Sequence, residues 1–198
     1  YSGAIKNYRE YIKYSKDNNL NSNFTDTYSN ICECLRKTQN YKETLNEVKE
    51  AWSECQSDYD RFDIKLQECY ALFMLGRYDD FLKEYNCLKE HKAYDRDLHG
   101  SVKEAVETFK KMLDGKDQEV METIKRFKEE SELEGYRLAV AYYKYKGNYT
   151  EAVKNQWMLI DIFGEYCGEL VQNDDRIAKN MSGAQQHEKE MQQMDYQN

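Results

Sequence analysis

Apolar residues in this chain recur three and four positions apart, in stripes that lie on either side of short polar turns. This spacing places each stripe on one face of an α-helix. It predicts pairs of helices of about 12 to 16 residues, each pair an antiparallel hairpin. The stripes are Tyr28, Ile31 and Leu35, then Leu45, Val48, Ala51 and Trp52; Phe62, Leu66, Cys69, Tyr70, Phe73 and Met74, then Phe81, Leu82, Tyr85 and Leu88; Val102, Val106, Phe109 and Leu113, then Val120, Met121, Ile124 and Phe127; Tyr136, Ala139, Val140 and Tyr143, then Ala152, Val153, Trp157 and Ile160.

The turn between the paired stripes carries a repeated signature. A tyrosine follows the turn at Tyr41, Tyr78 and Tyr149, another opens the chain at Tyr1, and Asp117 takes the same place once. These markers are 40, 37, 39 and 32 residues apart, and a glycine stands two positions before each of the last three. A supersecondary unit that recurs at a near-constant period predicts a helical-repeat array.

The units resemble the tetratricopeptide repeat. The unit around Tyr41 matches that family through Tyr28, Ile31, Cys32 and Leu35, and the unit around Tyr149 through Tyr136, Ala139, Val140, Tyr143, Gly147 and Ala152. The match departs at Thr44 and Phe81, where the family prefers a small residue, and three of the four intervals exceed the family's roughly 34 residues. The resemblance spans about residues 1–160. It implies an all-α fold, a right-handed α-solenoid of antiparallel helical hairpins. A weaker resemblance is to the soluble NSF attachment proteins.

The domain organisation follows from where the repeat holds. Residues 1–172 form the expected array, and residues 173–198 form a polar tail or one amphipathic helix. The first segment, with Tyr1, Ala4, Ile5, Tyr8 and Tyr11, aligns with the second helix of a hairpin. We therefore expect that the sequence enters an array partway through a repeat.

The composition of the chain argues against several classes of function. Proline is absent, as a nearly all-helical chain favours. The net charge of −8 argues against a nucleic-acid partner, which needs clustered positive charge. No apolar run approaches the length of about 18 residues that spans a membrane. The six cysteines lack the paired spacing of a zinc or redox motif, which favours a reducing, cytoplasmic location.

Candidate chemistry is sparse. The three histidines, His91, His99 and His187, are expected far apart in the array, and none of them stands beside an obvious nucleophile. Cys87 and His91 lie one helical turn apart, but two ligands do not make a metal site. Ser29 and Glu33 occupy positions where chaperone-binding relatives carry a lysine–asparagine carboxylate clamp, so that activity is not expected. We expect no enzyme, no cofactor and no metal.

Protein binding remains as the predicted function. Tyrosine offers a large apolar ring with one hydrogen-bonding group, and methionine makes adaptable contacts. The candidate interaction residues are Tyr142, Tyr145, Met181, Met191 and Met194. The sequence predicts a non-enzymatic scaffold, a subunit or adaptor of a larger intracellular assembly that binds helical or extended segments of other proteins. The alternatives are a peptide-sensing regulator and an attachment-protein-like adaptor of membrane fusion machinery.

Overall fold

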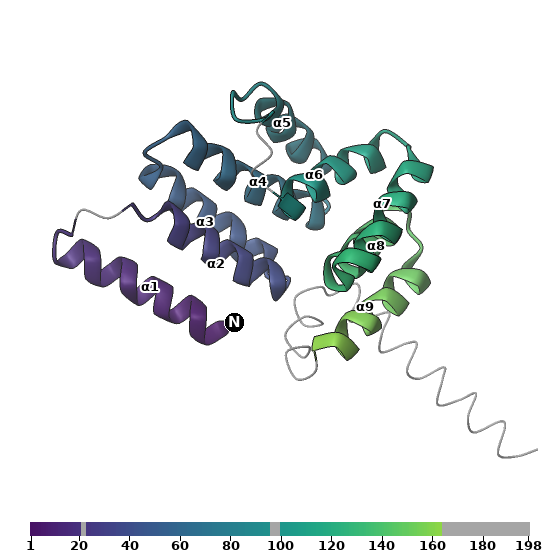
Figure 1. Cartoon of the computed structure of the whole chain (residues 1–198), viewed down its shortest axis with the longest axis horizontal. Coiled ribbons are helices and arrows are strands. Elements are labelled where there is room, and N and C mark those ends of the chain that lie inside the picture. Colours follow the sequence, from purple (N-terminus) through teal and green to yellow (C-terminus); the bar gives the residue numbers. More distant parts are fainter. Residues whose placement is uncertain (21–22, 96–99, 164–198) are drawn as a thin grey trace, which may run out of the picture. The chain divides into compact units, whose positions relative to one another are not determined.

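The computed structural model describes residues 1–20, 23–95 and 100–163. Within these residues the regular secondary structure is all α-helix, which confirms the predicted all-α class. The helices of this part are α1 (Ser2–Asp17), α2 (Thr25–Lys37), α3 (Tyr41–Glu54), α4 (Asp58–Met74), α5 (Tyr78–Lys89), α6 (Gly100–Leu113), α7 (Asp117–Glu130), α8 (Glu132–Tyr145) and α9 (Tyr149–Phe163) (Figure 1). The predicted domain boundary at residue 172 and the predicted tail or helix of residues 173–198 lie outside the described residues.

The turn signature marks helix starts, as predicted. α3, α5, α7 and α9 begin at Tyr41, Tyr78, Asp117 and Tyr149, and Tyr1 is the N-cap of α1. In each of these four turns, the residues that cap the C-terminus of one helix are followed directly by the first residue of the next helix. The signature therefore records how the chain reverses direction between two helices.

The turn after α4 shows the geometry. Gly76 has a positive φ of 74°, a left-handed conformation that glycine adopts without a steric penalty. Its N–H donates to the carbonyl of Phe73, and the N–H of Arg77 donates to the carbonyl of Leu72, both at 2.9 Å. This pair of bonds is a Schellman cap, which satisfies the last carbonyls of a helix. Arg77 is also the N-cap of α5, so one residue closes α4 and opens α5.

The first hairpin turn makes the same cap without glycine. Gln39 takes the left-handed conformation with φ 56°, and the N–H of Asn40 donates to the carbonyl of Leu35 at 2.8 Å. Asn40 then caps α3, because its side-chain oxygen accepts from the N–H of Glu43. The turns that follow α6 and α8 repeat the two-bond cap around Gly115 and Gly147.

The chain divides into two compact units, Tyr1–Asp117 and Gln118–Asn198. In the first unit, α2 packs against α1, α3 and α4, and α4 packs against α3, α5 and α6. The first helices of successive hairpins, α2, α4 and α6, are thus neighbours. Of the 17 residues of α4, 11 are buried, on nearly all sides of the helix. A helix that is apolar all round belongs in the interior, and α4 is the centre of this unit.

Aromatic rings fill the core beside α4. Phe73 of α4 stacks on Phe109 of α6 with the ring centroids 4.2 Å apart and the ring planes 1° from parallel. Phe81 of α5 meets Phe73 edge-on at 5.4 Å, and Tyr70 of α4 meets Phe109 in the same way at 5.1 Å. Offset-stacked and edge-on pairs are the favourable arrangements of aromatic rings. This cluster joins three helices of the first unit.

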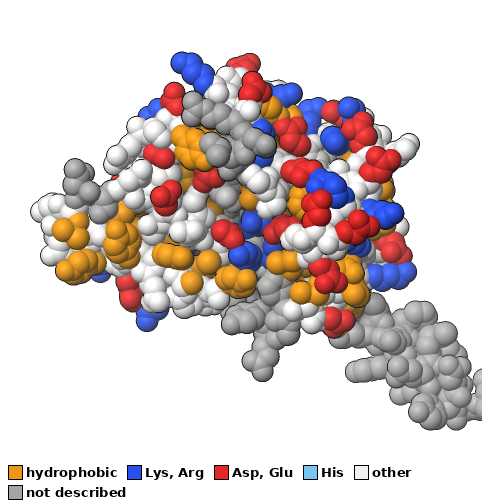
Figure 2. All heavy atoms as spheres, in the orientation of Figure 1, with side chains coloured by type: hydrophobic (Ala, Val, Ile, Leu, Met, Phe, Trp, Pro, Cys, Tyr) orange, Lys and Arg blue, Asp and Glu red, His pale blue; other side chains and the backbone are white. Residues whose placement is uncertain are grey.

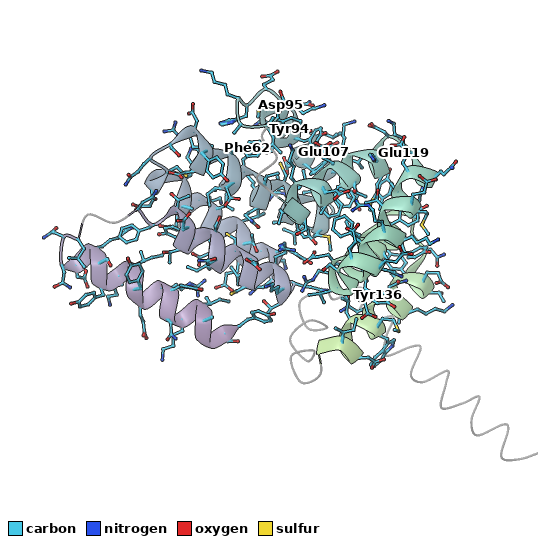
Figure 3. All side chains as sticks on the ribbon, in the orientation of Figure 1. Phe62, Tyr94, Asp95, Glu107, Glu119 and Tyr136 are labelled. Carbon is cyan, nitrogen blue, oxygen red and sulfur yellow. The ribbon has the colours of Figure 1, made fainter. Side chains whose placement is uncertain are left out.

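The connector after α5 is anchored by two tyrosines. The hydroxyl of Tyr85 donates to Glu107 Oε2 at 2.9 Å and lies 3.4 Å from the hydroxyl of Tyr94. The ring of Tyr94 meets Phe62 edge-on at 6.3 Å, and Figure 3 shows Phe62, Tyr94 and Glu107 gathered at this place. Lys103 Nζ also donates to the carbonyl of Tyr94. These contacts attach the connector to α4 and α6.

The second unit brings α7 and α8 very close together. Only Ser131 separates the two helices in sequence, and Gly135 of α8 lies against the backbone of α7. A Cβ atom at Gly135 would lie 2.4 Å from the backbone nitrogen of Lys128, so no larger residue fits there without displacing α7. α8 packs against α9 around the buried residues Val140, Val153 and Leu159.

Several residues of the predicted apolar stripes, such as Leu45 and Leu82, are half-buried, and two are exposed. Trp52 of α3 and Met121 of α7 are exposed. The ammonium group of Lys65 lies 4.8 Å from the Trp52 ring, a cation–π contact on the surface. The assignment of these two residues to buried faces was wrong, because each stands at the edge of its stripe. No helix within the described residues is long and apolar enough to cross a membrane.

Candidate interaction surfaces

The predicted interaction residues lie in different environments. Tyr142 is only 9% exposed, while Tyr145 is half-buried. Tyr143, which the pattern assigns to the core, is also half-buried, and its ring meets Tyr142 at 5.3 Å. Tyr145 therefore offers more of its ring to a partner than Tyr142 does, and their role at an interface stays a prediction. Met181, Met191 and Met194 lie outside the described residues.

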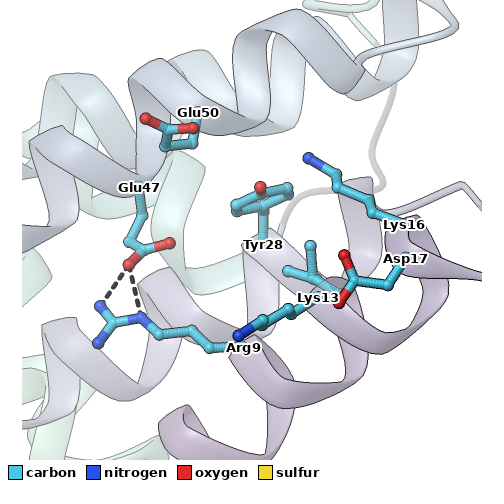
Figure 4. A pocket seen from close by; sticks show the side chains of 8 residues that line it. Arg9, Lys13, Lys16, Asp17, Tyr28, Glu47 and Glu50 are labelled. Atoms are coloured by element: carbon cyan, nitrogen blue, oxygen red, sulfur yellow. Dashed lines mark hydrogen bonds and ion pairs between the residues drawn. The ribbon is translucent and has the colours of Figure 1, made fainter.

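A groove separates α1 from α3 in the first unit (Figure 4). Its volume is about 380 Å³, and Tyr28 of α2 lies between the two helices. Charged side chains stand on both walls, although most of the lining surface is apolar. It consists of Arg9, Ile12, Lys13, Lys16, Asp17, Tyr28, Glu47 and Glu50.

Ion pairs bridge this groove near both ends. Arg9 Nη2 lies 2.6 Å from Glu43 Oε1, and Arg9 Nε donates to Glu47 Oε1 at 2.9 Å. Lys16 Nζ lies 2.6 Å from Glu54 Oε1. The Arg9–Glu47 and Lys16–Glu54 pairs both span 38 positions. Two contacts with the same offset show that α1 and α3 run parallel and in register.

The ion pairs set the electrostatics of the groove. Partial burial opposes the charge of Arg9, but the hydrogen bonds to Glu43 and Glu47 outweigh it and raise the pKa of the guanidinium. The hydrogen bond to Glu54 raises the pKa of Lys16 against a smaller opposing effect of burial. Burial raises the pKa of Tyr28, so its hydroxyl stays protonated. These groups hold two helices together, and exposed pairs of this kind contribute about 0–1 kcal/mol each.

A second, apolar groove lies on α7 in the second unit. Its volume is about 600 Å³. Met121 is exposed at this groove, and Ile124 is buried beneath it. Charged and polar residues form the rest of the lining, which comprises Gln118, Met121, Glu122, Ile124, Lys125, Lys128 and Glu129. An apolar floor with a polar rim is typical of protein-binding surfaces.

Lys128 is the most constrained residue of this groove. Its Nζ donates to Asn155 Oδ1 of α9 at 2.8 Å and lies 4.2 Å from the centre of the Tyr136 ring of α8. Burial lowers the pKa of Lys128, while Glu151 acts in the opposite direction. The cation–π contact with Tyr136 also favours the charged form. Lys128 thus connects all three described helices of the second unit, and we interpret it as a structural residue.

A third surface is the tyrosine face of α1, which we define as Ala4, Tyr8, Tyr11 and Tyr14. Tyr11 is 47% exposed and Tyr14 is 63% exposed. Figure 2 shows a row of hydrophobic side chains over α1 on the side in view. The Tyr11 ring meets Phe24, which is buried, edge-on at 6.3 Å. Apolar surface therefore continues from the core onto the outside of α1.

The described cysteines carry free thiols, and burial lowers the reactivity of some of them. Cys32 and Cys69 are fully buried, and burial raises the pKa of both thiols. A thiol held in the neutral form is a poor nucleophile. Cys87 is exposed and His91 half-buried. Across the described parts of the chain, no three His, Cys, Asp or Glu side chains gather as a metal site would require.

No protein-family model, no curated protein and no solved structure matches this chain. The resemblance to tetratricopeptide repeats thus stands on the residues alone.

Sequence reasoning missed two of these surfaces. The α1–α3 groove had a signal in the chain, because Arg9 and Lys16 stand seven residues apart, as do Glu47 and Glu54. Basic residues on one helix and acidic residues on another, at the same spacing, indicate that the two helices run parallel. Here the two helices are α1 and α3, the second helices of successive hairpins. The α7 groove had no such signal, because the same stripe of Met121, Ile124 and Phe127 fits a wholly buried face equally well.

Proposed function

We propose that this chain is a non-enzymatic protein–protein interaction scaffold, a tetratricopeptide-like α-solenoid segment that serves as a subunit or adaptor of an intracellular assembly. The repeated hairpins and the neighbouring first helices α2, α4 and α6 support the solenoid architecture. The free cysteines of the described residues support a reducing compartment.

One observation carries the proposal: large apolar side chains are exposed on a very polar chain. The mean hydropathy is −1.01 and 33% of the residues are charged. Tyr11 and Tyr14 on α1, Met121 on α7, and Met158 and Ile162 on α9 are nevertheless exposed. Exposed apolar groups that cluster on a polar protein mark sites of association.

The chemistry of these surfaces fits protein segments as partners. The α7 groove and the tyrosine face of α1 combine apolar contact area with a polar surround. Such surfaces accept the apolar side of a helix or an extended segment. Aromatic and methionine side chains at their centres supply most of the binding free energy in known interfaces.

Photo-crosslinking in cells that express the chain tests the proposal. Benzoylphenylalanine replaces Met121 in one variant and Tyr14 in another. Lys83, an exposed residue of α5, is replaced in the control. We expect discrete protein adducts from the first two positions, identified by mass spectrometry, and a much lower yield from position 83. With the identified partner purified, Met121→Asp or Tyr14→Asp should weaken binding at least about tenfold, the effect of losing one interface anchor.

The opposite outcome is equally clear. If the chain purifies from those cells as a stable, partner-free monomer, and all three positions give the same low adduct yield, the scaffold function is wrong.

A further inference from the structure

We propose that the groove between α1 and α3 binds a lysine or arginine side chain that a partner protein presents, and that Glu50 receives its charge. This inference rests on the proposed function and gives the chemistry of a further contact of the scaffold. The residues that line the groove all belong to α1, α2 or α3, so its walls and its floor lie within one unit.

The register of the two helices leaves one step of the groove without a cation. The two ion pairs that define this register both span 38 positions. One turn past Arg9, the same offset places Ile12 opposite Glu50. Ile12 is buried and belongs to the core cluster of the first unit. Between its two bases, α1 therefore presents an apolar side chain to a carboxylate. Figure 4 shows bonds from Arg9 to the neighbouring glutamate, and none to Glu50.

α3 supplies no cation for Glu50 either. Residues three and four positions away are the neighbours on a helix surface, and here they are Asn46, Glu47, Ser53 and Glu54. None of them is basic, and two carry the same charge as Glu50. Glu50 is exposed, and within the described residues its carboxylate enters no ion pair. A bound cation would relieve the repulsion along this face of α3.

The groove as a whole carries more acid than base. Its lining and the ion pairs across it contain five carboxylates and three cations. They are Asp17, Glu43, Glu47, Glu50 and Glu54, and Arg9, Lys13 and Lys16. Burial raises the pKa of the Tyr28 hydroxyl; Lys16 opposes this rise, and three carboxylates of α3, Glu50 among them, add to it. The floor therefore lies in a negative field, which favours a cation.

The rest of the groove suits the stem of a basic side chain. Most of the lining surface is apolar, and Ile12 and Tyr28 contribute to the lining. Lysine and arginine bury their methylene stems on such surface while the charged group stays near water and a carboxylate. An aromatic ring also attracts the charged group. The volume of about 380 Å³ is near the lower limit of ligand pockets, which suits one side chain better than a whole helix.

A peptide selection tests the proposal. A random peptide library is selected by mRNA display against the full chain, with the Glu50→Gln chain as counter-selection. We expect the enriched peptides to share a lysine or an arginine. Norleucine in place of that lysine, or citrulline in place of that arginine, removes the charge and keeps the length of the side chain. The replacement should weaken binding about tenfold, the effect of losing one hydrogen bond to a charged group. Fluorescence anisotropy of the labelled peptides measures it.

A parallel selection separates this groove from general attraction to an acidic chain. There the counter-selection uses Glu90→Gln, which removes the same charge at an exposed position of the first unit outside the groove. We expect no shared basic residue from it. Since the Glu50 side chain enters no ion pair, the melting temperature of Glu50→Gln should equal that of the unmodified chain, and a loss of binding cannot then come from a loss of folding.

Further variants assign the contact. Against Glu50→Gln, the neutral peptide should bind about as well as the basic one, because both replacements remove the same contact. Asn46→Lys should weaken binding severalfold, since it gives Glu50 a cation one turn away on its own helix. Lys13→Met should strengthen binding, since it removes a competing cation from the α1 wall.

Four outcomes would overturn the proposal. The first is a selection in which basic residues are no more frequent than with the Glu90→Gln counter-selection. The second is a loss from the neutral peptide that is equally large against Glu50→Gln, because the basic residue would then bind elsewhere. The third is weaker binding to Lys13→Met, which an anionic occupant would cause. The fourth is free spermidine that binds through Glu50 as tightly as the peptides do, because the occupant would then be a small amine. In each case, specific adducts at position 121 would leave the scaffold function standing, so the two failures are distinguishable.

Discussion

The helices α4 and α8 are both largely buried, yet they are buried by different means. Around α4, apolar rings fill the space: Phe73 and Phe109 stack at 4.2 Å, with Phe81 beside them. α8 places polar groups inside. Arg137 is 1% exposed, and its Nη1 lies 2.6 Å from Glu134 Oε1.

We infer from this contrast that apolar volume matters most around α4 and paired charge most within α8. Apolar packing depends on volume and tolerates changes that conserve it. A buried ion pair adds little net stability compared with apolar residues of the same shape, but it costs a great deal once one partner is removed. The stability of the first unit should therefore fall when buried side-chain volume is removed. The stability of the second unit should fall when one partner of its buried ion pair is removed.

Removal of the central ring of the first unit gives the largest expected effect. Phe109→Ala should lower its free energy of unfolding by about 4 kcal/mol, the cost of a truncated buried phenylalanine. Urea unfolding followed by Trp52 fluorescence in a Trp157→Phe background measures this loss. Phe109→Leu, which keeps most of the volume, is the control and should cost far less. Equal losses in both variants would contradict a volume-dependent core.

Removal of one charge from α8 comes next. Glu134→Ala takes away the carboxylate beside the buried Arg137 and should cost about 3 kcal/mol. The Trp157 transition in a Trp52→Phe background measures it, since Trp157 packs against the core cluster of the second unit. The double variant Glu134→Leu with Arg137→Met removes both charges and should be more stable than Glu134→Ala. If the double variant is less stable than Glu134→Ala, the ion pair stabilises the second unit by more than its desolvation costs. The contrast drawn between α4 and α8 would then be wrong.

Gly135→Ala tests the α7–α8 crossing. Alanine in a helix is ordinarily more stable than glycine by about 0.5–1 kcal/mol. Here its Cβ atom would overlap the backbone of Lys128, so we expect a loss of about 2 kcal/mol instead. Gly3→Ala is the matched control, because a Cβ atom at Gly3 of α1 meets nothing within 4 Å. The melting temperature should fall in Gly135→Ala and rise in Gly3→Ala. A higher melting temperature in Gly135→Ala would mean that α7 can move away from the added methyl group.

Alkaline pH gives the smallest expected effect. Burial keeps the Cys32 thiol protonated above its ordinary pKa of 9.0. Below that pH both folded and unfolded chains carry the proton, so stability is unaffected. Above it only the unfolded chain loses the proton, and each further pH unit destabilises the first unit by about 1.4 kcal/mol per such thiol. Urea midpoints from Trp52 at about pH 8 and pH 10 measure the slope. Cys32→Ala should make it shallower; an unchanged slope would exclude Cys32 as its source.

The sequence predicted the helices and their starts well, because these depend on local chemistry. Tyr41, Tyr78 and Tyr149 follow caps whose residues are adjacent in the chain. The stripes likewise identified Ile31, Val48 and Phe109 as core residues. Spacing within one helix is sufficient for both predictions.

What the sequence did not show depends on residues far apart in the chain. Glu134 and Arg137 are polar, and the apolar stripes give no signal that packing buries them. Gly135 has no side chain to mark that α7 approaches so closely. Trp52 has a core-like side chain at the edge of its stripe, where Lys65 covers it in place of a helix. In this sequence, contacts between residues far apart in the chain leave a signal only where opposite charges recur at equal spacing, as on α1 and α3.

In each hairpin turn, one residue takes part in the caps of both helices, and this has an evolutionary consequence. The N–H of Asn40 completes the cap of α2, and the side chain of Asn40 caps α3, so the turn between the two helices has no spare residue. A single inserted or deleted codon there would turn α3 by about 100° about its axis. Val48 and Ala51 would then face away from α2. Related genes should vary in length between hairpins, and keep the number of residues within each hairpin turn constant.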